Sequence, residues 1–194
     1  MKIAVARQIF PDILELLRAQ AEVIDNQAGD AISGEELAAR AKDADGLLVA
    51  TGLDFVDAKL LAAAPKLKVV ANIGVGYDNI DVDACRERGV IVTNTPGVVD
   101  DATADLAFAL MLAAARRVAE ADRFVRDGRW SESSQFGLGL DVHHQTLGIV
   151  GFGRIGKAIA KRAAGFDMRI LYYNRRRTDT VEEARLGVEF ADLD

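Results

Sequence analysis

The chain has 194 residues, of which half are hydrophobic and 28% are charged, a composition typical of soluble globular proteins. Its net charge is −6 and its basic residues form no long tract, which argues against nucleic acid or an anionic membrane as a partner. The single cysteine, Cys85, excludes an intrachain disulfide. No apolar run has the length of a secretory signal or a membrane span, so we expect a cytoplasmic protein.

Residues 1–99 alternate between short apolar runs and amphipathic segments. The expected strands cover 3–7, 21–25, 46–51, 67–74 and 90–96, and the expected helices cover 11–20, 34–44, 56–65 and 81–89. Pro11 marks a helix start, Ser33 with Glu36 has capping-box spacing, and Gly89 marks a helix end. Because the strands are near-continuous apolar runs, the pattern predicts a parallel sheet with helices on both faces.

Residues 101–127 have a different character. They contain neither Pro nor Gly and are rich in Ala and Leu, which predicts a single long helix. The many small apolar residues favour close packing on more than one side, either within the chain or at a subunit interface.

A glycine-rich turn follows the apolar segment 146–150. Gly151, Gly153 and Gly156 form the pattern G-x-G-x-x-G between a strand and the helix expected over 154–165. The first glycine permits a tight turn, the second lets the backbone approach a pyrophosphate, and the third lets helix and strand pack closely. The free N–H groups at the helix start favour phosphate. The motif in this context predicts a dinucleotide site.

The strand expected at 168–173 ends at Asn174, Arg175 and Arg176. Enzymes that use NAD normally carry Asp or Glu here for the adenosine ribose. With no carboxylate to repel a 2′-phosphate and two guanidinium groups to pair with it, the segment favours NADP(H). The alternative is a solvated arginine loop in an enzyme that also accepts NAD(H).

A second glycine loop, residues 73–78 (IGVGYD), follows a strand of the first region. Ligands collect at the carboxyl edge of a parallel sheet, and glycines expose N–H groups that can bind a carboxylate. From spacing alone, a plain turn is the favoured interpretation.

Taken in order, NIGVGYDNID, VTNTPGVVDDATADLAFALMLAAARR, TLGIVGFGRIGKAIAKRA and YYNRRR resemble the D-isomer-specific 2-hydroxyacid dehydrogenase family from end to end. The resemblance is strongest to its NADPH-dependent glyoxylate/hydroxypyruvate reductases, including the branch that reduces 2-ketogluconate. It implies an α/β protein with a flavodoxin-like substrate domain, whose N-terminal part is 1–99, followed by the start of a Rossmann coenzyme domain at 100–194. The implied reaction is reduction of a small 2-keto acid to the D-2-hydroxy acid. The long Ala-rich segment 101–127 favours a homodimer.

The resemblance also implies roles for single residues. Val75 and Gly76 would hold the substrate carboxylate through their N–H groups, and Leu53 would line the substrate pocket. Cofactor contacts would come from Thr103, Gly151, Phe152, Gly153, Arg154, Ile155, Gly156, Asn174, Arg175 and Arg176.

The family's catalytic Arg, Glu and His lie beyond the second strand of the coenzyme domain, and their positions would follow Asp194. We therefore expect a truncated chain that is inactive alone and whose coenzyme sheet has an uncovered edge. His143 and His144 are adjacent loop residues without companion ligands, so we expect neither a catalytic role for them nor a metal site.

Two other functions fit parts of the pattern. An NAD-dependent phosphoglycerate dehydrogenase-like enzyme is the main alternative within the family. A dinucleotide-sensing corepressor-like binding module is the alternative outside enzymology. Both use NAD, so the Asn174–Arg176 segment argues against them.

Overall fold

The structure, a computed structural model, describes residues 1–193 and divides into two compact units, Met1–Val98 and a second that begins at Val99. The boundary predicted from the sequence lies one residue later, after residue 99. Within residues 1–193, no helix combines the length and the apolar character needed to cross a bilayer.

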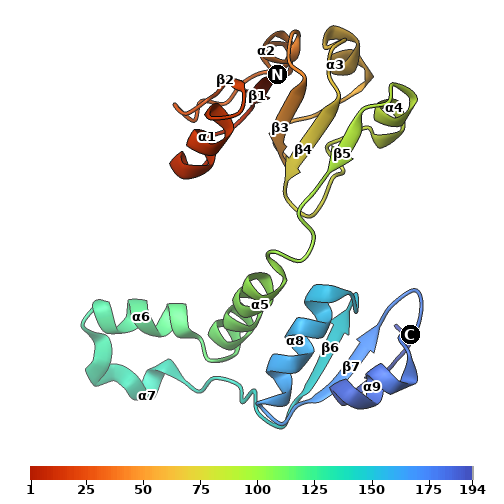
Figure 1. Ribbon diagram of the computed structural model, residues 1–194. Coiled ribbons are helices and arrows are strands. Elements are labelled where there is room, and N and C mark those ends of the chain that lie inside the picture. The colour runs from red at the N-terminus through yellow and green to blue at the C-terminus, as the bar shows by residue number, and fades with distance from the viewer. Residues whose placement is uncertain (194) are drawn as a thin grey trace. The chain divides into compact units, whose positions relative to one another are not determined.

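The first unit is a five-stranded sheet with the order β2-β1-β3-β4-β5, in which every pairing is parallel (Figure 1). Its elements are β1 (Lys2–Val5), α1 (Pro11–Arg18), β2 (Glu22–Ile24), α2 (Gly34–Ala41), β3 (Gly46–Ala50), α3 (Ala58–Ala63), β4 (Val69–Ile73), α4 (Val82–Glu87) and β5 (Ile91–Thr93). Every strand and helix expected in this region is present. The strand order is the flavodoxin-like one, which confirms that prediction.

Side-chain caps start three of these helices. The Ser33 hydroxyl accepts a hydrogen bond from the Glu36 N–H at 3.2 Å, as the capping-box spacing predicts. Asp57 and Asp81 cap α3 and α4 in the same way, at 2.8 and 2.9 Å. These caps fix where each helix begins and therefore where each preceding loop ends.

The core of the first unit lies between the sheet and its helices. Leu47, Val49, Val70 and Leu61 are each at most 1% exposed. Cys85 is fully buried among them, and burial raises the pKa of its thiol, as expected for a packing residue.

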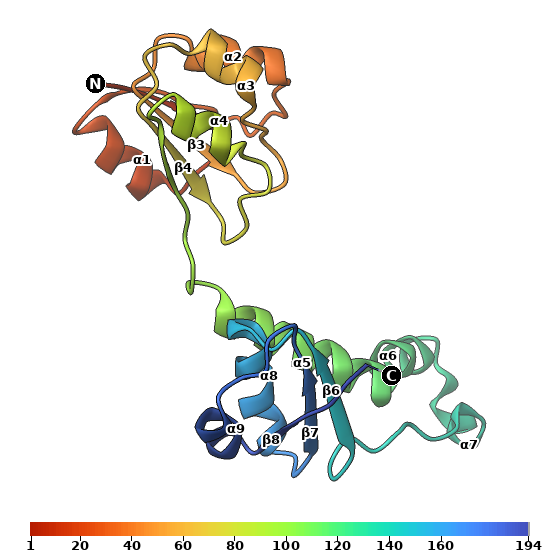
Figure 2. The same cartoon turned by 90° about the vertical axis from the view of Figure 1, so that its right-hand side faces the viewer.

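The second unit has a parallel three-stranded sheet with the order β6-β7-β8 (Figure 2). Its elements are α5 (Asp100–Ala115), α6 (Val118–Arg126), a 3₁₀ turn η1 (Arg129–Glu132), α7 (Ser133–Phe136), β6 (Thr146–Val150), α8 (Arg154–Ala164), β7 (Arg169–Tyr173), α9 (Thr180–Leu186) and β8 (Val188–Phe190). The succession β6-α8-β7 is the expected opening of a Rossmann fold.

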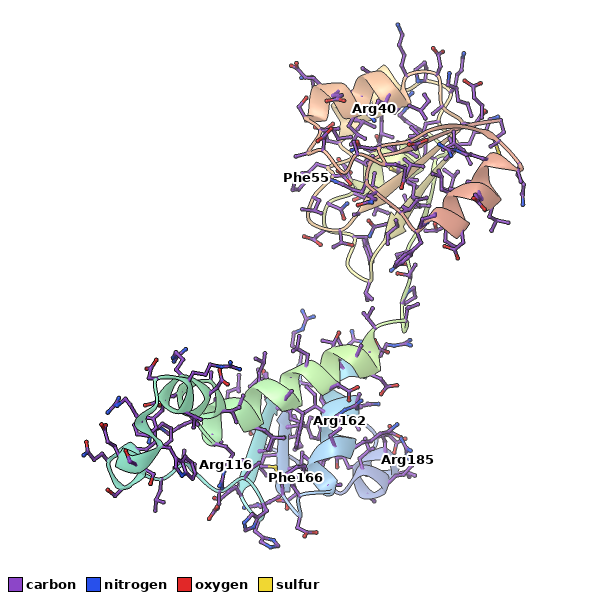
Figure 3. The ribbon with its side chains drawn as sticks, turned by 90° about the vertical axis from the view of Figure 1, so that its left-hand side faces the viewer. Arg40, Phe55, Arg116, Arg162, Phe166 and Arg185 are labelled. Atoms are coloured by element: carbon purple, nitrogen blue, oxygen red, sulfur yellow. The ribbon has the colours of Figure 1, made fainter. Side chains whose placement is uncertain are left out.

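Helix α5 packs along α8. Arg162 of α8 donates to the Asp105 carboxylate at 2.6 Å and to the Asp101 backbone carbonyl at 3.1 Å (Figure 3). At the other end of this interface, the Phe108 and Phe166 ring centroids are 5.0 Å apart. α5 therefore belongs to the same compact unit as the glycine-rich turn.

The expected single helix over 101–127 is wrong: the segment forms two helices that break at Arg117, whose φ is +54°. The Arg117 guanidinium donates to both carboxylate oxygens of Glu120 and, at 2.5 Å, to the carbonyl of Phe136. The Ala115 carbonyl accepts from the Leu140 N–H at 2.8 Å instead of continuing a helix. The contacts with Phe136 and Leu140, which are distant in the sequence, outweigh local helix propensity, and neither glycine nor proline marks the break.

Candidate functional site

In the loop after β4, each of three carbonyl groups accepts a hydrogen bond from elsewhere in the first unit. The Gly74 carbonyl accepts from the Thr95 N–H at 2.9 Å, and the Val75 carbonyl accepts from Asn94 Nδ2 at 2.8 Å. The Gly76 carbonyl accepts from Asn72 Nδ2 at 2.6 Å and from the Thr51 hydroxyl at 2.8 Å.

The N–H groups of Val75 and Gly76 in this loop are available to a ligand. Within residues 1–193, neither the Val75 N–H nor the Gly76 N–H donates a hydrogen bond. Gly74 is required because a Cβ there would overlap the Thr51 side chain. The loop therefore offers two adjacent backbone donors, as an anion such as a carboxylate needs.

Leu53 lies on the neighbouring loop after β3, where its side chain is 61% exposed. A buried ion pair holds this loop: Arg7, which follows β1, lies 2.8 Å from Asp54, whose side chain is 1% exposed. The second Asp54 oxygen accepts from the Ala50 N–H at 3.0 Å. Because β1 and β3 are neighbours at the point where the strand order reverses, the pair joins the two loops at the edge where ligands bind in such sheets.

The glycine-rich turn of the second unit meets each requirement of its motif. Gly151 has φ +98°, and a Cβ on Gly156 would overlap the Gly151 carbonyl oxygen. A Cβ on Gly153 would meet no atom within 4 Å, so space is open beside the backbone there. Gly153 also begins α8 with no side-chain cap, which leaves the first N–H groups of the helix for a ligand. These residues fit a dinucleotide pyrophosphate.

The other cofactor-site candidates have distinct surroundings. Phe152 is 2% exposed and stacks on Tyr172, so only its backbone faces the turn. The Arg154 side chain turns away to Asp100, at 2.6 Å, and Ile155 is half-buried. Thr103 is exposed on the first turn of α5, one turn before Ala107, which lines a groove beside β6.

Asn174, Arg175 and Arg176 together line a pocket of about 440 Å³ at the end of β7. Both arginines are exposed, and neither forms an ion pair within residues 1–193. Arg177 differs, because its guanidinium donates to both oxygens of Glu183, at 2.8 and 2.7 Å. This pairing, followed by the hydrogen bond from the Tyr172 hydroxyl, lowers the pKa of Glu183 to about 2.

His143 and His144 lie edge to face, with ring centroids 5.0 Å apart, on the loop before β6. The nearest carboxylate to His143 is Asp141, at 3.9 Å. Across residues 1–193 no group of three or more His, Cys, Asp or Glu side chains could hold a metal ion.

Sequence reasoning missed the residues that support these loops. Asn72 interrupts an apolar strand, which is a signal that could have been noticed, and Asn94 stands just after β5. The pairs Arg7–Asp54 and Arg177–Glu183 join residues that have no recognisable spacing, so only the fold brings them together.

Two family models match the chain. The catalytic-domain model of the D-isomer specific 2-hydroxyacid dehydrogenases matches residues 3–140, and the NAD-binding-domain model of the same family matches residues 108–194.

Individual proteins agree with this match. A glyoxylate reductase of Thermococcus onnurineus is 47% identical over 198 residues, which cover 100% of this chain and 59% of that protein. The crystal structure of a Thermus thermophilus protein superposes with a TM-score of 0.89 at 42% identity, over 100% of this chain and 60% of that one. An NADPH-dependent glyoxylate/hydroxypyruvate reductase from Sinorhizobium meliloti, solved with citrate, has a TM-score of 0.79 at 35% identity, over 98% and 57%.

The chain thus spans less than two thirds of the length of these relatives. Both family models nevertheless match, and together they cover residues 3–194. The chain belongs to the D-isomer specific 2-hydroxyacid dehydrogenase family.

Proposed function

We propose that this chain supplies the carboxylate site and the dinucleotide-phosphate site of a reductase that converts a small 2-keto acid to the D-2-hydroxy acid with NADPH. The first unit acts as the N-terminal part of the substrate domain, and the second as the start of the coenzyme domain. The observation that carries the proposal is the glycine-rich turn, where Gly151, Gly153 and Gly156 each meet a separate requirement of the dinucleotide-binding motif.

The substrates we favour are glyoxylate and hydroxypyruvate, with 2-ketogluconate as a third candidate. Similar proteins are named glyoxylate reductase or glyoxylate/hydroxypyruvate reductase. In this chain the Val75 and Gly76 N–H groups would hold the substrate carboxylate, and the exposed Leu53 would lie beside the rest of the substrate.

A bound NADPH supplies the hydride that reduces the carbonyl carbon. The chain's contribution is binding and orientation. The α8 N-terminus and the open space at Gly153 would receive the pyrophosphate through the backbone from Phe152 to Ile155. Thr103 would lie toward the nicotinamide.

NADPH is favoured over NADH by charge. Asn174 places no carboxylate beside the ribose, and Arg175 and Arg176 present exposed guanidinium groups. A 2′-phosphate would pair with them, whereas a free ribose hydroxyl gains little from a cation. NAD(H) binding remains the alternative.

The proton donor is not assigned to any residue of this chain. His143 and His144 lie on an exposed loop, and their only nearby carboxylate within residues 1–193 is 3.9 Å away.

The partner we propose is a second copy of the chain. α6 and α7 stand to one side of the β6-β7-β8 sheet in both Figure 1 and Figure 2. Large apolar side chains are exposed along α5 and this arm: Leu106, Leu110, Trp130 and Leu138 are 60–95% exposed. Sedimentation equilibrium should show a dimer, and a monomer at high concentration would contradict this.

Ligand titration followed by backbone amide NMR tests the function. Glyoxylate should shift the Val75 and Gly76 signals, and NADPH should shift those of Gly153 and bind more tightly than NADH. Propanol and acetate are the controls for a neutral small molecule and a carboxylate without a keto group. Tighter binding of NADH, or glyoxylate shifts that spare Val75 and Gly76, would contradict the proposal.

A further inference from the structure

The consecutive arginines at the end of β7 are not equivalent. Arg175 and Arg176 are exposed and form no ion pair within residues 1–193. Arg177 is engaged instead, since its Nε and one terminal nitrogen both bond the Glu183 carboxylate, and its guanidinium carbon lies 5.6 Å from the Phe190 ring centre. Arg177 is therefore part of the protein's own structure.

Glu183 is a buried carboxylate that accepts hydrogen bonds from two side chains. The residue is 7% exposed, and besides Arg177 it receives the Tyr172 hydroxyl at 2.6 Å. Tyr172 is 1% exposed, and its hydroxyl oxygen accepts from the Thr178 N–H at 3.0 Å. The loop that carries Arg175 and Arg176 is thus hydrogen-bonded to one buried cluster at its C-terminal end, through Arg177 and Thr178.

The same cluster contacts the glycine-rich turn. The Tyr172 ring stacks on Phe152, with centroids 4.2 Å apart and an interplanar angle of 29°. Next to it, the Gly151 N–H donates to the Tyr173 carbonyl at 2.9 Å. Tyr172 therefore has its ring against the pyrophosphate turn and its hydroxyl against the arginine loop.

We infer that Tyr172, Glu183 and Arg177 form a positioning network that holds Arg175 and Arg176 at a fixed distance from the glycine-rich turn and so sets the preference for a 2′-phosphorylated dinucleotide. The inference rests on the proposed function. Arg177 itself is a positioning residue, because its Nε and one terminal nitrogen are bonded to Glu183.

The physical reason is the shape of the ligand. The pyrophosphate and the 2′-phosphate belong to one adenosine, so both sites must match a fixed spacing. A loop that is already ordered loses less conformational entropy when it binds than a loose one does. The network should therefore strengthen binding only of ligands that reach both sites.

The experiment compares two fragments of the dinucleotide in the 194-residue chain. Adenosine 2′,5′-bisphosphate carries both phosphates, and adenosine 5′-monophosphate lacks the 2′ group. Isothermal titration calorimetry measures each affinity in the wild type, Tyr172→Phe and Arg177→Lys. Tyr172→Phe keeps the ring stacked on Phe152 and removes only the hydroxyl, so it should preserve the fold.

In both variants, affinity for the bisphosphate should fall about tenfold, the size of one charge-assisted hydrogen bond, while affinity for the monophosphate stays the same. Arg185→Lys is the matched control, because Arg185 pairs with Glu182 on the exposed side of the same helix α9. It should change neither affinity. In an Arg175→Ala/Arg176→Ala background, Tyr172→Phe should have no further effect on the bisphosphate.

The outcomes separate the inference from the function on which it rests. A wild type that does not prefer the bisphosphate overturns the proposed NADPH preference, and the inference with it. A wild type that prefers it, with variants that keep that preference, overturns only the inference. Equal losses for both ligands would mean that the network is merely structural, and that result also overturns the inference.

Discussion

The loop at residues 74–76 and the glycine-rich turn at 151–156 both offer backbone N–H groups after a parallel strand, but they hold them in different ways. In the first, side chains and a neighbouring N–H bind all three carbonyl groups, with Asn72, Thr51 and Asn94 as the side-chain donors. In the second, no side chain caps the turn, and its shape depends on glycines and on the start of α8. An anion site can thus be built from distant side chains or from local backbone geometry.

The largest effect should come from the buried ion pair that joins the loops of the first unit. Asp54→Ala removes the carboxylate shared by the Arg7 guanidinium and the Ala50 N–H, and Arg7 keeps only its bond to the Leu53 carbonyl at 3.3 Å. Breaking a buried pair from one side costs about 3–5 kcal/mol. Native-state hydrogen exchange at Val49 and Val70, both in the core of this unit, should report that loss.

The matched control is Asp43→Ala, which removes an aspartate from an exposed pair with Lys66. Exchange in the core should be almost unchanged there. A similar response to both substitutions would mean that the Arg7–Asp54 pair does not support the loop.

Gly156→Ala tests the glycine-rich turn, whose shape depends on local backbone geometry. Its methyl group would overlap the Gly151 carbonyl oxygen, so α8 must move away from β6. We expect a destabilisation of about 1–3 kcal/mol in urea unfolding, typical of overpacking, together with loss of NADPH binding.

Gly148→Ala is the control for that change, because a Cβ at this position in β6 meets no atom within 4 Å. It should leave both unfolding and NADPH binding close to the wild type. Unimpaired NADPH binding by Gly156→Ala would show that close packing of helix and strand is not what the third glycine provides.

The contrast between local backbone geometry and distant side chains also explains which features could be predicted from the sequence. The glycine-rich turn, the alternation of strands and helices and the Ser33 cap all depend on residues close together in the chain. The flavodoxin-like order of the first sheet followed from the family resemblance. Such local patterns carry their meaning in their spacing.

The supports of the first unit's loop could not be predicted in this way. Asn72, Thr51 and Asn94 come from three separate segments, and Arg7 meets Asp54 only because β1 and β3 are neighbours. The break at Arg117 has the same origin, since its contact with the Phe136 carbonyl overrides a sequence that favours helix. Pairings that depend on tertiary structure leave no periodic signal.

Asn72→Ala should have a smaller effect, because the Gly76 carbonyl keeps its bond from the Thr51 hydroxyl. We expect a loss of about 1 kcal/mol in the stability of the first unit and weaker glyoxylate shifts at Val75 and Gly76. Adding Thr51→Val removes the second donor, so the double variant should lose more than the sum of the single ones. Additive losses would show that the two side chains do not share one task.

The last prediction concerns how the stability of the second unit depends on pH. In the folded chain Arg177 and Tyr172 lower the pKa of Glu183 from 4.5 to about 2, whereas in the unfolded chain this pKa returns to its ordinary value. Protonation therefore favours the unfolded state, so the stabilisation is complete above the ordinary value and is lost as pH falls through that interval. Urea unfolding followed by the amide NMR signals of Ile149 and Ile170, both buried in the second unit, should show the wild type losing more stability than Glu183→Gln over this window. Parallel pH profiles for the two proteins would mean that the Glu183 carboxylate does not hold the arginine loop in place.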